Sequence, residues 1–223
     1  MTTTIPRASA ILGAARTLAA KLLLAVPIDR AALSEAMTES AGGNDAAGAW
    51  QQRDSFEALE VALSLAIPEL VARMDVGAAI STLEALLREL PTHTVRSEEQ
   101  IQFQQFSTPP ALARLAVHLA RLSCDDVLLE PSAGTGIIAS LAEGAVKDLI
   151  LNELEPTRAD LLEAVFAGTK VYRHDGAKLS ALLSGTERPS VAVMNPPFSV
   201  SQSRGEDQNT AARHLRAALD HLL

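Results

Sequence analysis

A chain of 223 residues with 48% hydrophobic residues can bury one or two ordinary cores. Its formal net charge is −8: residues 1–100 hold eight Lys and Arg against thirteen Asp and Glu, and residues 101–223 hold eleven against fourteen. Neither half is therefore a basic module that neutralises nucleic-acid phosphates by itself. The single cysteine, Cys124, excludes an intramolecular disulfide and favours a reducing, cytoplasmic setting.

The first 90 residues are rich in Ala and Leu at helical spacing, and turn signals such as Pro27 and Pro91 separate the runs. Helices are predicted over residues 8–25, 30–41, 51–74 and 76–90. Arg16 and Lys21 interrupt the first apolar run, so neither a signal peptide nor a membrane span is expected. We predict an all-helical N-terminal region over residues 1–93, a small bundle or an appendage to which the sequence assigns no chemistry.

The segment from Gln104 to Ala113 contains Phe106, followed by Ser107-Thr108-Pro109-Pro110. Thr108 is suited to cap a helix, because its hydroxyl can accept a backbone N–H and proline is tolerated in the first helical turn. A helix that begins at these prolines is therefore one interpretation of the segment. A second interpretation depends on a family resemblance.

A buried strand is predicted over Asp126–Glu130, followed by Pro131-Ser-Ala133-Gly134-Thr-Gly136 and a helix that starts at Ile137. Glycines allow a tight turn and a close approach of the backbone to a ligand, and the first N–H groups of a helix have no partner inside it. The pattern therefore predicts a ligand-binding loop. Gly134–Ala139 also fits the dinucleotide fingerprint G-x-G-x-x-A, with Glu153 at about the spacing of a ribose-binding acid, so a nicotinamide cofactor is an alternative.

Three further apolar runs predict strands over residues 148–152, 169–173 and 190–194. Glu153 and Asp175 follow the first two of these strands, although a solvated acid or an Asp-Gly turn has the same pattern. Together with the strand over 126–130, four strands joined by crossover segments predict an open α/β sheet. The five histidines show no metal-binding spacing with one another or with Cys124, so no metal site is predicted.

Asn195-Pro196-Pro197-Phe198 follows the apolar run Val191–Met194. Two consecutive prolines remove two backbone donors and fix two φ angles, which holds the carbonyls and the Asn195 amide rigidly at the end of the strand. Acceptors held in this way can bind both N–H groups of an exocyclic amine and direct its lone pair at an electrophile, and Phe198 can stack on a base. A proline-rich turn after a strand is the alternative interpretation.

These motifs, in this order over about residues 100–223, resemble those of the class I S-adenosylmethionine-dependent amino-methyltransferases, in particular the N6-adenine DNA methyltransferases. The resemblance implies a Rossmann-like α/β methyltransferase core over residues 94–223 and catalytic roles for Asn195, Pro196, Pro197 and Phe198. It implies that S-adenosylmethionine is bound by Phe106, Thr108, Glu130, Pro131, Ala133, Gly134, Gly136, Glu153, Asp175 and Asn195. In duplex DNA the adenine would be flipped out into the Asn195–Phe198 site, with residues 199–209 as a lid.

The sheet of this family has seven strands, so the four predicted here, followed by a helix over 210–223, form an incomplete core. The resemblance implies that three later strands and a target-recognition region come from a missing segment or a completing subunit. The Ala/Leu-rich leader also resembles the methyltransferase-like part of large plasmid or phage proteins related to Strawberry notch helicases, in which a downstream motor would hold the duplex. The expected partner is a nucleic acid, most of all DNA, and no association with a membrane is expected. The open alternatives are a methyltransferase-like binding module without turnover, which holds the donor or nothing, and RNA adenine, guanine or protein glutamine acceptors.

Overall fold

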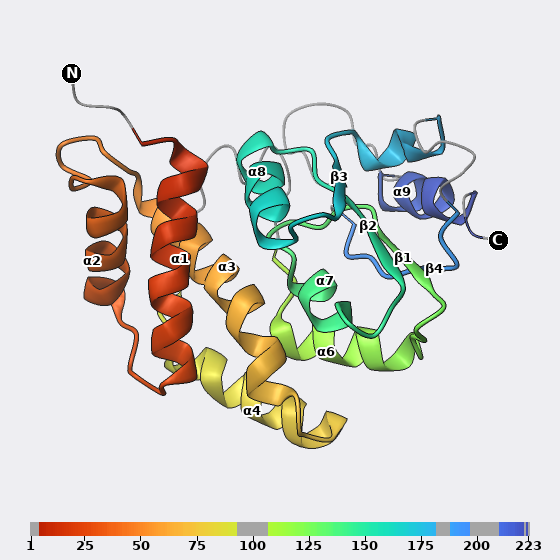
Figure 1. Ribbon diagram of the computed structural model, residues 1–223, viewed down its shortest axis with the longest axis horizontal. Helices are drawn as coiled ribbons and strands as arrows, with labels where there is room; N and C mark the ends of the chain where they lie inside the picture. The colour runs from red at the N-terminus through yellow and green to blue at the C-terminus, as the bar shows by residue number, and fades with distance from the viewer. Residues whose placement is uncertain (1–4, 93–106, 182–187, 197–209, 221, 223) are drawn as a thin grey trace.

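The computed structural model describes residues 5–92, 107–181, 188–196, 210–220 and 222 (Figure 1). The helices are α1 (Arg7–Leu23), α2 (Arg30–Ala41), α3 (Gln52–Val71), α4 (Val76–Glu89), α6 (Pro110–Leu119), α7 (Ile137–Ala142), α8 (Pro156–Val165), α9 (Thr210–Leu219) and the 3-10 helix η1 (Gly176–Ala181). The strands are β1 (Val127–Glu130), β2 (Asp148–Asn152), β3 (Lys170–Tyr172) and β4 (Val191–Ala192). Within these described ranges, no helix is both long enough and apolar enough to cross a membrane.

The four strands form one sheet in the order β3-β2-β1-β4, and every neighbouring pair is parallel. Parallel pairing requires crossover connections, which α7 and α8 supply between β1, β2 and β3. The carboxyl ends of all four strands therefore lie at one edge of the sheet. The predicted fold, a helical region followed by a four-stranded Rossmann-like α/β sheet, is confirmed. Because dinucleotide-binding sheets begin with the same strand order, the topology alone does not distinguish the two cofactors.

β3 and β4 are shorter than the strands predicted over residues 169–173 and 190–194. Both lie at the edges of the described sheet, where only one neighbouring strand supplies backbone partners, so the ladder ends sooner. The Val193 N–H still donates to the Leu129 carbonyl at 3.2 Å. The chain after β4 therefore stays next to β1 as far as Val193, two residues before Asn195. The last helix also ends earlier than predicted, at Leu219 instead of Leu223.

Side chains of the central strands alternate between two hydrophobic layers, as the two-residue period of a strand requires. Leu128 and Leu149 join the main core with side chains of α6, α7 and α8. Leu129 and Ile150 point to the opposite face, where they pack with Ala218 of α9. The sheet is therefore covered by helices on both faces.

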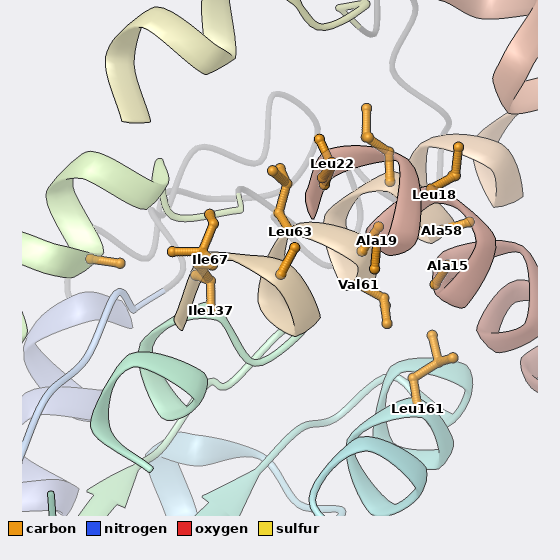
Figure 2. Packing of buried hydrophobic residues seen from close by; sticks show 14 of the residues in the cluster. Ala15, Leu18, Ala19, Leu22, Ala58, Val61, Leu63, Ile67, Ile137 and Leu161 are labelled. Atoms are coloured by element: carbon orange, nitrogen blue, oxygen red, sulfur yellow. The ribbon is translucent and has the colours of Figure 1, made fainter. Parts of the chain in front are cut away.

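The main core continues from the helical region into the α/β layer. In Figure 1, α3 packs on α7, α1 on α8 and α4 on α6. Figure 2 shows that Leu18 of α1, Ile67 of α3, Ile137 of α7 and Leu161 of α8 belong to one cluster of buried side chains. The helical region is thus packed against the α/β layer and does not extend away from it.

Gly136 and Gly144 flank α7, and both have a positive φ, 86° and 78°. A Cβ at Gly136 would lie 2.5 Å from Cε2 of Phe166, whereas a Cβ at Gly144 would have nothing within 4 Å. We expect Gly144→Ala to lower the free energy of unfolding by about 1–2 kcal/mol, the cost of a left-handed backbone. Gly136→Ala should lower it by about 1–3 kcal/mol more, because Phe166 must move. Urea denaturation measures both losses, and equal losses would mean that the contact with Phe166 has no energetic effect.

Candidate functional site

The glycine loop, residues 131–136, connects the end of β1 to the start of α7. Gly134 and Gly136 both have a positive φ, 57° and 86°, and the Gly136 N–H donates to the Ala133 carbonyl at 2.9 Å, so the chain turns sharply. A Cβ at Gly134 would meet Arg158 Nη1 at 3.8 Å, an ordinary contact, so the backbone conformation is what requires glycine there. The loop brings its backbone close to the carboxyl end of β1, as a ligand-binding loop must.

Glu130, the last residue of β1, is 1% exposed. The Ala139 N–H donates to its carboxylate, but Oε2 has no hydrogen-bond partner among the residues that the structure describes. Burial raises the pKa of Glu130 well above its ordinary value; the Ala139 hydrogen bond opposes this effect and the charge of Glu153 adds to it. Because an unpartnered buried acceptor is costly, Oε2 is a group that an N–H donor of a ligand would satisfy.

Glu153 follows β2 and is bound to the glycine loop. Its Oε2 accepts the Gly134 N–H at 2.8 Å, and its Oε1 accepts the Glu155 N–H at 2.9 Å. Burial raises the pKa of Glu153, while these two hydrogen bonds and the charge of Arg158 lower it. A carboxylate has about four acceptor positions, so these two bonds leave capacity for the hydroxyl groups of a ribose.

Asn152, the buried last residue of β2, ties three strand ends together. Its Nδ2 donates to the carbonyls of Pro131 and His174, both at 2.9 Å, and its Oδ1 accepts the His174 N–H at 3.0 Å. Its backbone carbonyl accepts the Ala133 N–H at 2.9 Å. One amide therefore fixes the glycine loop relative to the segment that leads to Asp175.

Asp175 lies just before η1, and its Oδ1 accepts the Ala177 N–H at 3.0 Å. His214 of α9 is buried, with its Nε2 3.8 Å from Asp175 Oδ1 and its Nδ1 3.5 Å from Ser132 Oγ. Burial lowers the pKa of His214, and the charge of Asp175 opposes this effect. The last helix therefore supplies an imidazole between the glycine loop and Asp175. No motif in the sequence predicts this arrangement.

Thr108 and Asn195 meet although 87 residues separate them, because Asn195 Nδ2 donates to Thr108 Oγ1 at 3.0 Å. Helix α6 has Pro109 as its N-cap and no side-chain cap hydrogen bond, so the interpretation of Thr108 as the N-cap is wrong. The hydroxyl is placed one residue before the cap position and binds Asn195 instead. Since β4 pairs with β1, Asn195 and the glycine loop lie at the ends of neighbouring strands.

The predicted site residues that the structure describes gather at the carboxyl edge of the sheet. They are Glu130, Pro131, Ala133, Gly134, Gly136, Glu153, Asp175, Asn195 and Pro196. Thr108 reaches the same edge through its hydrogen bond with Asn195. Phe106, Pro197, Phe198 and residues 199–209 lie outside the described residues, so their roles stay predictions. Residues that no motif predicted also contribute, and they are Glu57, Glu60, Asn152, Arg158 and His214. Within the described ranges, no three His, Cys, Asp or Glu side chains are grouped in a way that could hold a metal ion.

No protein-family model and no curated protein sequence matches the chain. Among solved structures, the chain is similar to a proposed RNA methyltransferase from Pyrococcus horikoshii, at 23% identity and a TM-score of 0.47, with 64% of this chain and 68% of that chain covered. It is similar to an rRNA methylase from Streptococcus thermophilus at 14% identity and a TM-score of 0.38, with 53% and 66% covered. It is also similar to a modification subunit of a proposed type I restriction enzyme from Vibrio vulnificus YJ016 at 14% identity and a TM-score of 0.42, with 65% and 35% covered.

Proposed function

We propose that this chain binds S-adenosylmethionine and forms the donor side, and part of the acceptor side, of a methyltransferase that acts on an exocyclic amine. The observation that carries the proposal is the pairing of β1 with β4, because it puts the glycine loop and Asn195-Pro196 at the ends of neighbouring strands. A nicotinamide enzyme also needs a glycine loop, but it gives no role to an Asn-Pro pair held beside Thr108.

The described residues fit this cofactor. Glu130 Oε2 is a buried acceptor without a partner among the described residues, and a ligand ammonium group would satisfy it. Glu153 has capacity for ribose hydroxyls, and the 43% exposed side chain of Asp175 can accept a hydrogen bond from an adenine amino group. When bound, S-adenosylmethionine supplies an electrophilic methyl group on a positively charged sulfur. Three acids along one sheet edge suit a cationic ligand.

Asn195 is the residue that we assign to the acceptor amine. Its hydrogen bond to Thr108 uses the amide nitrogen and so fixes the orientation of the amide plane. Its Oδ1 is the acceptor atom of the amide and the one that we assign to an amine N–H, and Pro196 restricts the backbone that follows. Hydrogen bonds of this kind favour the charge that develops on the amine nitrogen, so positioning and electrostatics supply the catalysis without a strong base.

We further propose adenine N6 in DNA as the acceptor, on the strength of the Asn-Pro-Pro-Phe motif. A net charge of −8 gives little attraction for phosphates, so duplex binding would come from another region or a partner, with the exposed Arg213 and Arg216 of α9 as a local contribution. The alternative acceptors are an RNA adenine, a guanine and a protein glutamine. The alternative to an enzyme is a module without turnover in a larger helicase-type protein. Methyl transfer to DNA, RNA and protein substrates in parallel distinguishes them.

Binding to the chain tests the donor assignment directly. We expect S-adenosylhomocysteine to bind more tightly than NAD, because Glu130, Glu153 and Asp175 lie at three strand ends next to the glycine loop. Isothermal titration calorimetry of the 223-residue chain with each ligand measures both affinities. Saturable binding of NAD with no response to S-adenosylhomocysteine would overturn the assignment and favour the dinucleotide interpretation.

A further inference from the structure

A group of charged side chains joins the helical region to the α/β layer. Arg158, in the first turn of α8, is 3% exposed. Its guanidinium pairs with Glu57 through Nε and with Glu60 Oε2 at 3.5 Å through Nη2, and both acids belong to α3. Glu57 and Glu60 are three residues apart, so one face of α3 presents both carboxylates to the same arginine.

The same group reaches the glycine loop. The hydroxyls of Thr135, inside the loop, and of Ser107, just before α6, lie near the Glu60 carboxylate, where hydrogen bonding to them lowers the pKa of Glu60. Arg158 Nη1 lies 3.8 Å from the position of a Cβ on Gly134. Arg158 also acts on the charge of Glu153, whose Oε2 holds the Gly134 N–H. Two acids therefore lie at consecutive residues of the loop: Glu153, which follows β2, at Gly134, and Glu60 of the helical region at Thr135.

Arg158 keeps both acids at the loop. Burial lowers the pKa of its guanidinium, but the charges of Glu57, Glu60 and Glu153 raise it above its ordinary value, so Arg158 stays charged. Burial raises the pKa of Glu60, and the charge of Arg158 is the largest effect that opposes it. Without Arg158 the two carboxylates, which are 10% and 29% exposed, would repel one another.

We infer that Glu57, Glu60 and Arg158 are positioning residues of the glycine loop, so that helix α3 of the N-terminal region is a structural part of the donor site. The inference rests on the proposed function, because it assigns the loop to S-adenosylmethionine. Glu60 and Thr135 fix the loop from the side of the helical region, while Glu153 and Asn152 fix it from the side of the sheet. Donor affinity should then depend on side chains from a region that contributes none of the predicted ligand contacts.

The test uses the 223-residue chain with Glu60→Gln, Thr135→Val and Thr135→Ser. The matched control is Glu163→Gln. Glu163 lies on α8, as Arg158 does, and pairs with the more exposed Arg173, which follows β3. We expect Glu60→Gln and Thr135→Val to bind S-adenosylhomocysteine about tenfold or more weakly, since each removes part of a hydrogen bond to a charged group. Thr135→Ser keeps the hydroxyl and should bind like the wild type, as should Glu163→Gln. Calorimetry well below the unfolding transition of each variant measures the affinities.

Amide hydrogen exchange without ligand supplies the second measurement. Positioning predicts faster exchange at Gly134, Thr135 and Gly136 in Glu60→Gln and Thr135→Val, with unchanged protection in β1 and β2. Faster exchange throughout those strands would indicate general destabilisation and overturn the inference, as would unchanged loop exchange. If the wild-type chain does not bind S-adenosylhomocysteine, the proposed function fails, but the exchange measurement still decides whether α3 positions the loop.

Discussion

Asn195→Ala is expected to lower the rate of methyl transfer by about a hundred- to a thousandfold, the usual effect of removing one hydrogen-bond partner of a transition state. The affinity for S-adenosylhomocysteine should change little, because we assign Asn195 chiefly to the acceptor amine and the three strand-end acids hold the donor. Transfer of a tritiated methyl group to adenine-containing DNA measures the first effect, and calorimetry measures the second. The experiment presupposes that the wild-type chain, with any partner that completes it, is active.

Asn195→Asp is the matched control for this variant. An aspartate keeps an oxygen that can accept an amine N–H, and the Thr108 hydroxyl can donate to it, so the acceptor and the link to Thr108 are both retained. We therefore expect more activity from Asn195→Asp than from Asn195→Ala. Unchanged transfer by Asn195→Ala would remove this residue from the mechanism. A wild-type protein that binds the donor but methylates no DNA, RNA or protein would favour the binding module.

Arg158→Met is expected to lower the free energy of unfolding by about 3–5 kcal/mol, because it leaves the carboxylates of Glu57 and Glu60, 10% and 29% exposed, together without their counter-charge. Arg173→Met is the matched control. Arg173 also pairs with two carboxylates, Asp160 at 2.7 Å and Glu163 at 2.8 Å, but its side chain is 39% exposed. Exposed pairs contribute about 0–1 kcal/mol, so the control should lose little stability.

Urea denaturation of both variants at the same pH measures this difference. In addition, the triple change Arg158→Met, Glu57→Gln and Glu60→Gln should recover part of the loss, because it removes the carboxylates that Arg158→Met leaves unpaired. Equal destabilisation by Arg158→Met and Arg173→Met would show that burial does not set the strength of the pair. The ion pairs of Arg158 would then contribute little to the attachment of α3 to α8.

The sheet could be predicted from the sequence because its signals are local. Apolar runs such as Val127–Leu129 and Leu149–Leu151, each ended by a polar residue or a turn, are long enough for a buried parallel strand. The glycine loop can be predicted for the same reason. The positive φ angles at Gly134 and Gly136 favour glycine, and glycines are visible in the sequence. Backbone geometry and burial of this kind depend on neighbours along the chain.

Contacts between distant segments could not be predicted in this way. Thr108 has the local pattern of a helix cap, but its hydroxyl binds Asn195 across 87 residues. In the sequence, Glu60 is a helical glutamate like Glu84, which forms an exposed pair with Arg88 four residues later. Only the fold brings Arg158 to Glu60. One signal was present: a cation in the first turn of a helix opposes the helix dipole, so Arg158 in that position indicates a tertiary partner.

The continuous core has a consequence for the order in which the chain is made. Ile67 of α3 belongs to the same buried cluster as Ile137 of α7, so the face of α3 that packs on α7 stays uncovered until α7 has left the ribosome. At about 5–20 residues per second, the roughly 70 residues between them take about 4–14 s to synthesise. During that interval the nascent helices present apolar surface, which makes this stage of synthesis the one most prone to aggregation.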